Sequence, residues 1–362
     1  SMGSINMSFL VESSSSTTTI LGKDVQKRCM ISFLRTNCLI LFEQAQAEWP
    51  ISSKNNMTIF SPLTGSTNVR KVKDISSKSI IDAYKKDVGV DVSKYFKGLE
   101  NISIYECLDS GYKFYYPLTL AGSCEFYEQL QKYPWYYMDW KWEHQKALET
   151  LGNAKNLLEI GCGRGEFIEK VQKTGVNCVG LELNEDAVAE GKKRGVKILN
   201  ESIEEYAKTH VGEFDVVCSF QVVEHISNVG EFIKASIECL KPGGKLIICV
   251  PNNDSVLYKI GADMYLNMPP HHMGLWDVNS LVKLPRFFPI EVDSVYLEPL
   301  QSYHAWFAKS VAKKKFKEKL SNKNLNWIPF LKTFADRIIN MTVRGISEHI
   351  IGHSIMVVYT KK

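Results

Sequence analysis

The sequence predicts an α/β protein built on a doubly wound parallel sheet. From residue 156 onward, seven apolar runs of strand length recur along the chain, and amphipathic helical patterns separate the first five. The first run ends in a glycine-rich turn that leads into one of these helices. Strands that alternate with helices form parallel sheets covered on both faces. The seven runs are 157–160, 176–181, 196–199, 214–220, 245–250, 290–297 and 353–360.

The composition is that of an ordinary globular protein of 362 residues, with 44% hydrophobic and 23% charged residues. A chain of this length can bury a large core without cross-links, which excludes a disordered chain and a disulfide-stapled scaffold. The 44 basic and 40 acidic residues leave a net charge of only +4, which does not favour a nucleic-acid partner. The nine cysteines lack framework spacing and are interpreted as reduced thiols of a cytoplasmic protein. The apolar stretch 29–42 is shorter than the roughly 20 residues of a spanning helix, so no integral membrane segment is expected.

The chain divides into three predicted parts. Residues 1–19 are interpreted as a tag remnant followed by a disordered Ser/Thr-rich tail. Residues 20–139 are expected to form a helix, over 23–49, and a small mixed cap domain. Residues 140–362 carry the predicted sheet, with a helical insertion at 299–350 before the last strand.

The insertion is rich in lysine, with seven lysines between positions 308 and 324. We interpret them as a solvated helix face. An acidic substrate, an anionic carrier domain, RNA or a membrane surface remain alternative partners. RNA ranks low because no aromatic-interleaved basic motif accompanies the lysines.

The strongest local motif is the segment 157–165, which reads Leu-Leu-Glu-Ile-Gly-Cys-Gly-Arg-Gly. Its glycines let the backbone turn tightly and approach a ligand closely. Glu182 closes the next strand about 20 residues on, where a carboxylate can hold two ribose hydroxyls. The Gly-x-Gly-x-Gly spacing disfavours the pyrophosphate-binding loop, and Glu159 would repel phosphate but suit a cationic ligand.

These residues resemble motif I and the acidic end of the second strand in class I S-adenosylmethionine-dependent methyltransferases. The run 214–226, Phe-Asp-Val-Val-Cys-Ser-Phe-Gln-Val-Val-Glu-His-Ile, is similar to the fourth strand and its loop in that family. The segment 240–246 resembles the turn before the fifth strand and the segment 250–252 its end, so the resemblance covers about 155–253. It implies a seven-stranded Rossmann-like methyltransferase sheet and S-adenosyl-L-methionine as cofactor, with S-adenosyl-L-homocysteine as product.

The resemblance also implies which residues contact the cofactor. The glycine loop would wrap the methionine part, Glu182 would bind the ribose diol, and Leu183 would pack on the adenine. Ser202 and Ile203 stand where the family places its contact with the adenine amine, and Phe220 and Gln221 would line the methyl-donor region. The implied cofactor residues are Glu159, Gly161, Cys162, Gly163, Gly165, Glu182, Leu183, Ser202, Ile203, Phe220 and Gln221.

Histidines are the candidate catalytic residues. His271 and His272, within Pro-Pro-His-His-Met-Gly-Leu-Trp (269–276), resemble a segment of a glycan and natural-product subgroup of the family. One of them could accept or position the acceptor proton, because histidine is the natural base near neutral pH. Alternatively, both hold the loop through hydrogen bonds to the backbone. His225 is a further candidate base, with helix capping as its alternative role.

Aromatic residues around 127–142 are interpreted as a hydrophobic clamp, as a lid over a greasy or planar substrate, or as both. The candidate substrate-binding residues are Tyr136, Trp140, His144 and Trp276.

Two short turns of the cap resemble zinc-binding turns of related chains. Their ligand positions are Ser61 and Thr64 in the first turn and Cys107 and Ser110 in the second. Structural zinc needs four good ligands, so with one thiol left we expect no metal.

The predicted function is methyl transfer from S-adenosylmethionine. The favoured acceptor is a hydroxyl or carboxyl oxygen of a secondary metabolite or peptide natural product, and an acidic or carrier-bound acceptor is among the candidates. Carbon or nitrogen methylation in sugar or glycan tailoring is the alternative. A non-catalytic protein that binds the cofactor is a third hypothesis.

Overall fold

The computed structural model describes residues 58–130, 132–133, 138–255, 258, 265–301, 304 and 351–362. The predicted tail, the helix expected at 23–49 and most of the lysine-rich insertion therefore lie outside the described residues.

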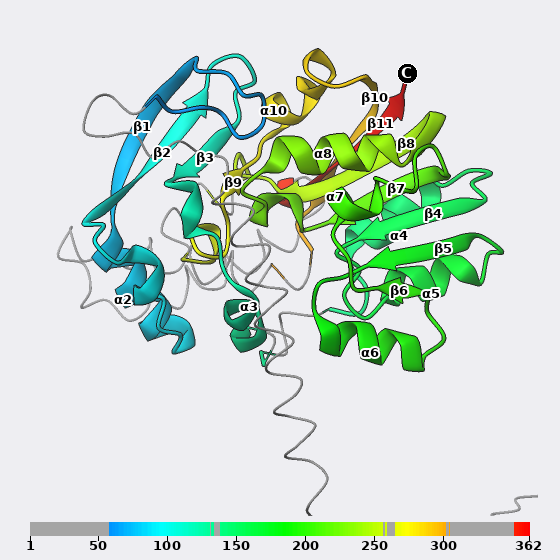
Figure 1. Cartoon of the computed structure of the whole chain (residues 1–362), viewed down its shortest axis with the longest axis horizontal. Helices are drawn as coiled ribbons and strands as arrows, with labels where there is room; N and C mark the ends of the chain where they lie inside the picture. Colours follow the sequence, from blue (N-terminus) through cyan, green and yellow to red (C-terminus); the bar gives the residue numbers. More distant parts are fainter. Residues whose placement is uncertain are drawn as a thin grey trace, which may run out of the picture. The chain divides into compact units, whose positions relative to one another are not determined.

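A seven-stranded sheet is the centre of the described chain (Figure 1), with the strand order β10-β11-β8-β7-β4-β5-β6. Adjacent strands from β6 to β8 are parallel, whereas β11 is antiparallel to both of its neighbours. β11 thus runs opposite to the other six strands of this sheet. The reversed strand pairs its apolar centre with that of β8, as in Met356 opposite Cys249. The strands are β4 (Asn156–Ile160), β5 (Asn177–Leu181), β6 (Ile198–Leu199), β7 (Phe214–Phe220), β8 (Leu240–Pro251), β10 (Ile290–Pro299) and β11 (Ile351–Lys361).

All seven predicted strands are present, with bounds that differ from the predicted ones most of all for β8. β8 begins at Leu240, which pairs with Phe214, so the segment 240–246 that resembles a turn lies within the strand, next to a register irregularity of the pairing with β7. β6 is short because it pairs with β5 at only two positions, Ile198 and Leu199.

Helices cover both faces of this sheet, which confirms the doubly wound class. Neighbouring strand residues alternate between two hydrophobic cores, because successive side chains of a strand point to opposite faces. Leu158 joins the core under α7, α8 and α10, whereas Leu157 joins the core under α4, α5 and α6. The helices are α4 (Trp142–Thr150), α5 (Glu166–Gln172), α6 (Glu185–Lys193), α7 (Ile203–Tyr206), α8 (Val229–Glu238) and α10 (Val278–Val282).

A second sheet of four strands has the order β1-β2-β3-β9. Its last strand comes from a distant part of the chain, since Gly274 pairs with Phe114 of β3. The helices α2 and α3 pack with this sheet around a third core that includes Ile80, Phe126 and Met273. The elements are β1 (Val69–Ser76), α2 (Ser77–Val88), β2 (Asn101–Cys107), β3 (Lys113–Tyr116), α3 (Cys124–Leu130) and β9 (Gly274–Leu275).

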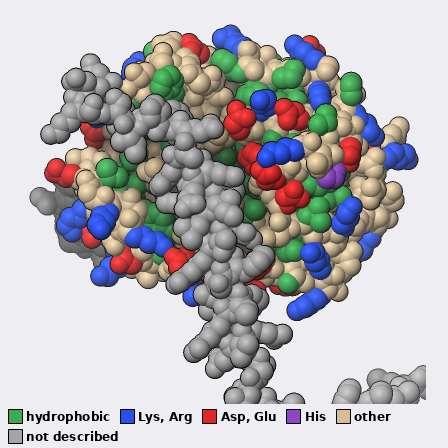
Figure 2. All heavy atoms as spheres, in the orientation of Figure 1, with side chains coloured by type: hydrophobic (Ala, Val, Ile, Leu, Met, Phe, Trp, Pro, Cys, Tyr) green, Lys and Arg blue, Asp and Glu red, His purple; other side chains and the backbone are tan. Residues whose placement is uncertain are grey.

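Charges of both signs are interspersed over the face seen in Figure 2, without a large region of one sign among the coloured residues. Within the described ranges, no helix combines the length and the apolar character needed to cross a bilayer.

Candidate active site

The glycine loop connects β4 to α5 at the carboxyl edge of the seven-stranded sheet. Gly161 and Cys162 donate their backbone N–H groups to Leu181 O, at 2.8 and 3.1 Å, which fixes the loop against β5. Gly161, Gly163 and Gly165 have φ angles of 68°, 55° and 80°, a region that side chains with a Cβ rarely adopt. A Cβ at Gly161 would also overlap the side chain of Val222. The predicted glycine positions are therefore required by the backbone path.

Glu182 holds the loop from the end of β5. Its Oε2 accepts a hydrogen bond from Gly163 N at 2.9 Å, and its Oε1 accepts one from Asn184 N at 2.8 Å. Burial raises the pKa of this carboxyl, while the backbone hydrogen bonds act in the opposite direction. Leu183, the next residue, is 47% exposed although it is a large apolar side chain. A carboxylate held in place can accept hydrogen bonds from ribose hydroxyls, and the exposed apolar side chain beside it can pack on an adenine.

Glu159 is a buried carboxyl at the root of the same loop. It is only 4% exposed, and its Oε2 has no hydrogen-bond partner among the described residues. Burial, together with Glu166 and Glu182, raises its pKa well above the ordinary range. A buried polar atom without a partner is costly, so the site fits a ligand that brings a hydrogen-bond donor or a positive charge. The α-ammonium group of S-adenosylmethionine is such a donor.

The other predicted cofactor residues have different environments. The Cys162 side chain is buried, and burial raises its pKa, so only its backbone is available to a ligand. Ser202 caps α7 by accepting a hydrogen bond from Glu205 N at 3.3 Å, and Ile203 is buried in the core. Asn200 donates to Glu182 O at 2.9 Å, which ties this segment to the ribose-binding position.

Phe220 and Gln221 follow β7 next to the glycine loop. Phe220 packs edge-to-face on Phe167, with 5.0 Å between ring centroids. Gln221 has a φ of 56°, and its side-chain Nε2 donates to Ser354 Oγ at 3.3 Å. Gln221 thus has a strained backbone directly after the end of β7, in the region that the resemblance assigns to the methyl donor. Strain of this kind is typical of functional sites.

The structure brings His225, His271 and His272 into one cluster. The rings of His271 and His272 stack with centroids 4.6 Å apart, and the ring of His225 lies 4.7 and 4.9 Å from them. Burial lowers the pKa of His225 to about 4 and that of His271 to about 3, and it lowers the pKa of His272 well below its usual value. The three imidazoles are therefore neutral at physiological pH.

Backbone hydrogen bonds position two of these rings, as the alternative interpretation expected. His225 Nδ1 lies 2.6 Å from His271 O, and His271 Nδ1 lies 2.8 Å from Leu266 O. Because a carbonyl oxygen only accepts, each Nδ1 carries the proton in these pairs, and each Nε2 carries the lone pair. One imidazole can therefore be held in place through Nδ1 and still accept a proton at Nε2.

Of the candidate substrate residues that the structure describes, Trp140 and His144 pack together, whereas Trp276 lies elsewhere. His144 is 9% exposed and packs against Trp140, Phe167 and Phe220 behind the methyl-donor region. Trp276 is fully buried and packs on Tyr112 with 4.3 Å between centroids, so it offers no surface to a substrate. Tyr136 lies outside the described residues.

Several polar residues near the cluster were missed by the sequence analysis. Glu143 is 2% exposed, and burial raises its pKa. Tyr258 Oη lies 2.9 Å from His353 Nε2 at the start of β11. No local sequence pattern marks these positions. His353, for example, reaches this edge of the sheet only because β11 runs opposite to its neighbours.

The two cap turns retain matching geometry without four thiols. Gly65 N donates to Ser61 O at 2.8 Å, and Gly111 N donates to Cys107 O at 2.7 Å. Thr64 Oγ1 lies 3.5 Å from Cys107 Sγ, so a hydroxyl contacts the remaining thiol. The absence of metal at these turns stays a prediction.

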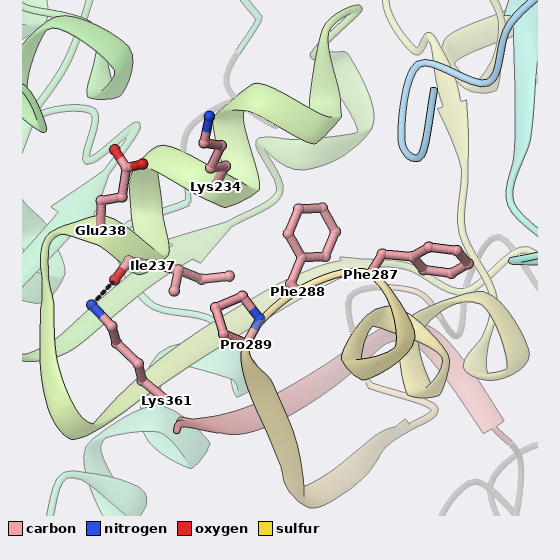
Figure 3. A pocket seen from close by; sticks show the side chains of 7 residues that line it. All are labelled: Lys234, Ile237, Glu238, Phe287, Phe288, Pro289 and Lys361. Atoms are coloured by element: carbon pink, nitrogen blue, oxygen red, sulfur yellow. Dashed lines mark hydrogen bonds between the residues drawn. The ribbon is translucent and has the colours of Figure 1, made fainter. Parts of the chain in front are cut away.

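A pocket of about 360 Å³ lies at the opposite edge of the seven-stranded sheet, where β8 and β10 begin and β11 ends (Figure 3). Lys361 reaches across it and donates to Ile237 O at 2.8 Å. The carboxyl ends of β4, β5 and β7 face away from this edge, so the pocket is separate from the glycine loop. Its lining residues are Lys234, Ile237, Glu238, Phe287, Phe288, Pro289 and Lys361.

Comparisons with known proteins place this geometry in a family. Residues 135–290 match the family model described as "Methyltransferase domain". The ubiquinone biosynthesis O-methyltransferases of Sodalis glossinidius and Escherichia coli are 28% identical over 138 residues, which is 36% of this chain. The chain covers only 55% and 57% of their lengths. The crystal structure of a SAM dependent methyltransferase from Archaeoglobus fulgidus aligns with a TM-score of 0.42 at 17% identity, covering 60% of this chain and 90% of that one.

The strand order, the glycine loop and the match of residues 135–290 identify this part of the chain as a methyltransferase domain of the class I, S-adenosylmethionine-dependent kind. S-adenosylmethionine is the cofactor of the class.

Proposed function

We propose that this protein transfers a methyl group from S-adenosylmethionine to a hydroxyl of a small-molecule or peptide natural product. The observation that carries the proposal is Glu159, a buried carboxyl with a partnerless oxygen beside a loop that Glu182 holds in place. When bound, the cofactor supplies an electrophilic methyl group on a positively charged sulfur.

The residues of the chain bind and orient the two reactants. Glu159 meets the ammonium group, Glu182 the ribose hydroxyls, and Leu183 the adenine. Gln221 and Phe220 close the end of the methionine site and exclude water from it. Positioning is the main task, because an activated donor needs an aligned nucleophile more than it needs acid–base chemistry.

The histidine cluster supports a hydroxyl acceptor, because a hydroxyl has to lose its proton. His225 is the candidate base of the cluster, because its Nδ1 faces His271 O, which assigns the proton-accepting lone pair to Nε2. A carboxylate acceptor is already an anion and needs no base, so the histidine cluster would have no proton to take from it. The matching relatives are named O-methyltransferases, which agrees with oxygen as the acceptor atom.

A panel of hydroxylated metabolites and peptides tests the proposal, scored by a mass gain of about 14 daltons for an added CH2 and by release of S-adenosylhomocysteine. His225→Gln should lower kcat by about 10²- to 10⁴-fold with cofactor affinity nearly unchanged. His271→Gln and His272→Gln should show smaller losses. Fragmentation that places the methyl on carbon or nitrogen would select glycan tailoring instead. Cofactor binding without turnover on any acceptor would favour a non-catalytic protein.

A further inference from the structure

We propose that His225, His271 and His272 form a binding site for one divalent transition-metal ion of the Zn²⁺ class. This goes beyond methyl transfer, and it does not depend on the identity of the acceptor. The cluster is distinct from the two cap turns, for which the sequence predicts no metal.

The geometry of the three side chains fits a tetrahedral ion after a small movement. One ligand atom from each histidine lies within 4.8 Å of the other two. Zinc–nitrogen bonds of about 2.0–2.1 Å require nitrogen atoms about 3.3 Å apart in a tetrahedron. The rings therefore have to close by about 1.5 Å, which side-chain torsions can supply.

Each imidazole is oriented as metal-binding histidines usually are, with Nδ1 directed at an oxygen acceptor. The acceptors are His271 O for His225, Leu266 O for His271 and Asn267 Oδ1 for His272, at 2.6, 2.8 and 3.0 Å. Asn267 donates its Nδ2 to Asn253 Oδ1 at 2.8 Å, which fixes the amide so that Oδ1 faces the ring. Such outer contacts select the tautomer whose Nε2 lone pair can bind a metal.

Glu224 places a buried carboxyl beside the three imidazoles, where its oxygens can bind a cation. Its Oε1 lies 3.9 Å from His225 Nε2, and its Oε2 has no hydrogen-bond partner among the described residues. The side chain is only 1% exposed. A buried carboxyl with an unsatisfied oxygen at the edge of three imidazoles completes a ligand set of three nitrogens and one oxygen, which zinc accepts.

The two segments that carry the ligands are fixed to each other. Met273 N donates to Glu224 O at 2.8 Å, and Tyr127 Oη donates to His271 O at 3.2 Å. Neither bond uses a histidine side chain, so both can persist when one of the histidines is replaced. The site is thus largely formed before an ion arrives, which favours binding.

Titration of the chelator-treated full chain with Co²⁺ tests the site directly, because tetrahedral Co²⁺ absorbs in the visible range. No cofactor or acceptor is needed, so the result is separate from the proposed activity. We expect one equivalent to bind, and calorimetry with Zn²⁺ should give the same stoichiometry. His225→Gln and His272→Gln should each weaken binding by at least about 100-fold, more than the usual cost of losing an outer contact.

Three further variants complete the test. Asn267→Ala removes the outer contact of His272, together with the Asn267–Asn253 hydrogen bond, and should weaken binding by about 10- to 100-fold. Glu224→Gln keeps the shape, removes the charge and should also weaken it. His210→Gln, at a histidine stacked on Tyr206 away from the cluster, should bind as the unchanged chain does. If circular dichroism shows that His225→Gln or His272→Gln does not fold, the metal affinities of Asn267→Ala and Glu224→Gln test the site instead.

No bound Co²⁺, or equal binding by all variants, would overturn the proposal. If His225 is the base, as proposed above, a bound ion occupies the lone pair that accepts the proton. Zn²⁺ should then inhibit methyl transfer, and chelator should restore it. Binding without inhibition would exclude His225 as the base and leave the metal site intact.

Discussion

Both carboxylate oxygens of Glu182 accept hydrogen bonds from backbone amides of the glycine loop and of the turn before α6. Under the proposed function the residue therefore has two roles, since it shapes the loop and its remaining lone pairs would bind a ribose. Glu182→Gln, which keeps the shape of the side chain, separates these two roles better than truncation to alanine does.

Glu182→Ala should weaken binding of S-adenosylmethionine by about 2–4 kcal/mol, because two charge-assisted hydrogen bonds to the ribose are lost. Glu182→Gln keeps one acceptor oxygen and should lose less. Calorimetry with S-adenosylhomocysteine measures both, and thermal unfolding controls for the loop. Unchanged affinity in both variants would remove Glu182 from the cofactor site.

His144 should make stability depend on pH. Burial lowers its pKa to about 3, whereas an unfolded histidine titrates near 6.5. The unfolded chain therefore binds a proton below pH 6.5 that the folded chain does not, so stability is full above pH 6.5 and falls as the pH decreases. Between pH 7 and pH 5 this one residue should cost about 2 kcal/mol.

Urea unfolding at these two pH values should show a smaller loss for His144→Phe than for the unchanged chain. Phenylalanine fits the aromatic surroundings of Trp140, Phe167 and Phe220, although Lys141 N loses its acceptor, Nδ1, at every pH. His144→Gln should flatten the pH dependence in the same way. Equal slopes for all three proteins would contradict the prediction.

At the level of the elements, the turn between β4 and α5 depends on packing as well as on backbone angles. Gly165 has a φ of 80°, and a Cβ there would lie 2.8 Å from Val196 Cγ1 and 3.1 Å from Ile198 Cδ1. Gly175, after α5, has a similar φ of 86°, but a Cβ there would have nothing within 4 Å.

Gly175→Ala should therefore cost only the left-handed backbone strain, about 1–2 kcal/mol. Gly165→Ala should cost the same strain plus about 1–3 kcal/mol for displacing buried side chains. Unfolding free energies from urea titration compare the two. Equal costs would show that the core around Val196 and Ile198 adjusts freely.

The sequence predicted the elements of the sheet well, because each has a local signal. The apolar run and the glycines of β4 and its loop lie within ten residues of each other. The direction of β11 has no such signal, since a strand of apolar residues pairs equally well either way until its neighbours are placed. The convergence of His225 with His271 is likewise invisible, as 46 residues separate them.

At the scale of the whole described chain, Trp276 connects the two sheets. It packs on Tyr112, and both belong to the core that also contains Leu158 and Val217 of the seven-stranded sheet. Gly274 and Leu275 extend the four-stranded sheet just before it. The tryptophan predicted to contact substrate is instead part of a shared core.

Trp276→Ala should lower the unfolding free energy by about 3–5 kcal/mol, the cost of truncating a buried aromatic side chain. Trp276→Phe should cost less, because it keeps most of the ring contact with Tyr112. Circular dichroism and tyrosine fluorescence should report the same shifted midpoint if the two sheets unfold together. A loss confined to one probe would show that they unfold separately.

The sequence by itself determined the α/β class, the seven strands and the glycine loop with Glu159 and Glu182, because each depends on residues close together in the chain. The tertiary structure alone decided which way β11 runs, that Trp276 is buried, and that an oxygen of Glu159 lacks a partner. It also brought His225, His271 and His272 into one cluster, with Glu224 beside it. These features depend on side chains brought together from distant segments by packing, and no local pattern records such contacts.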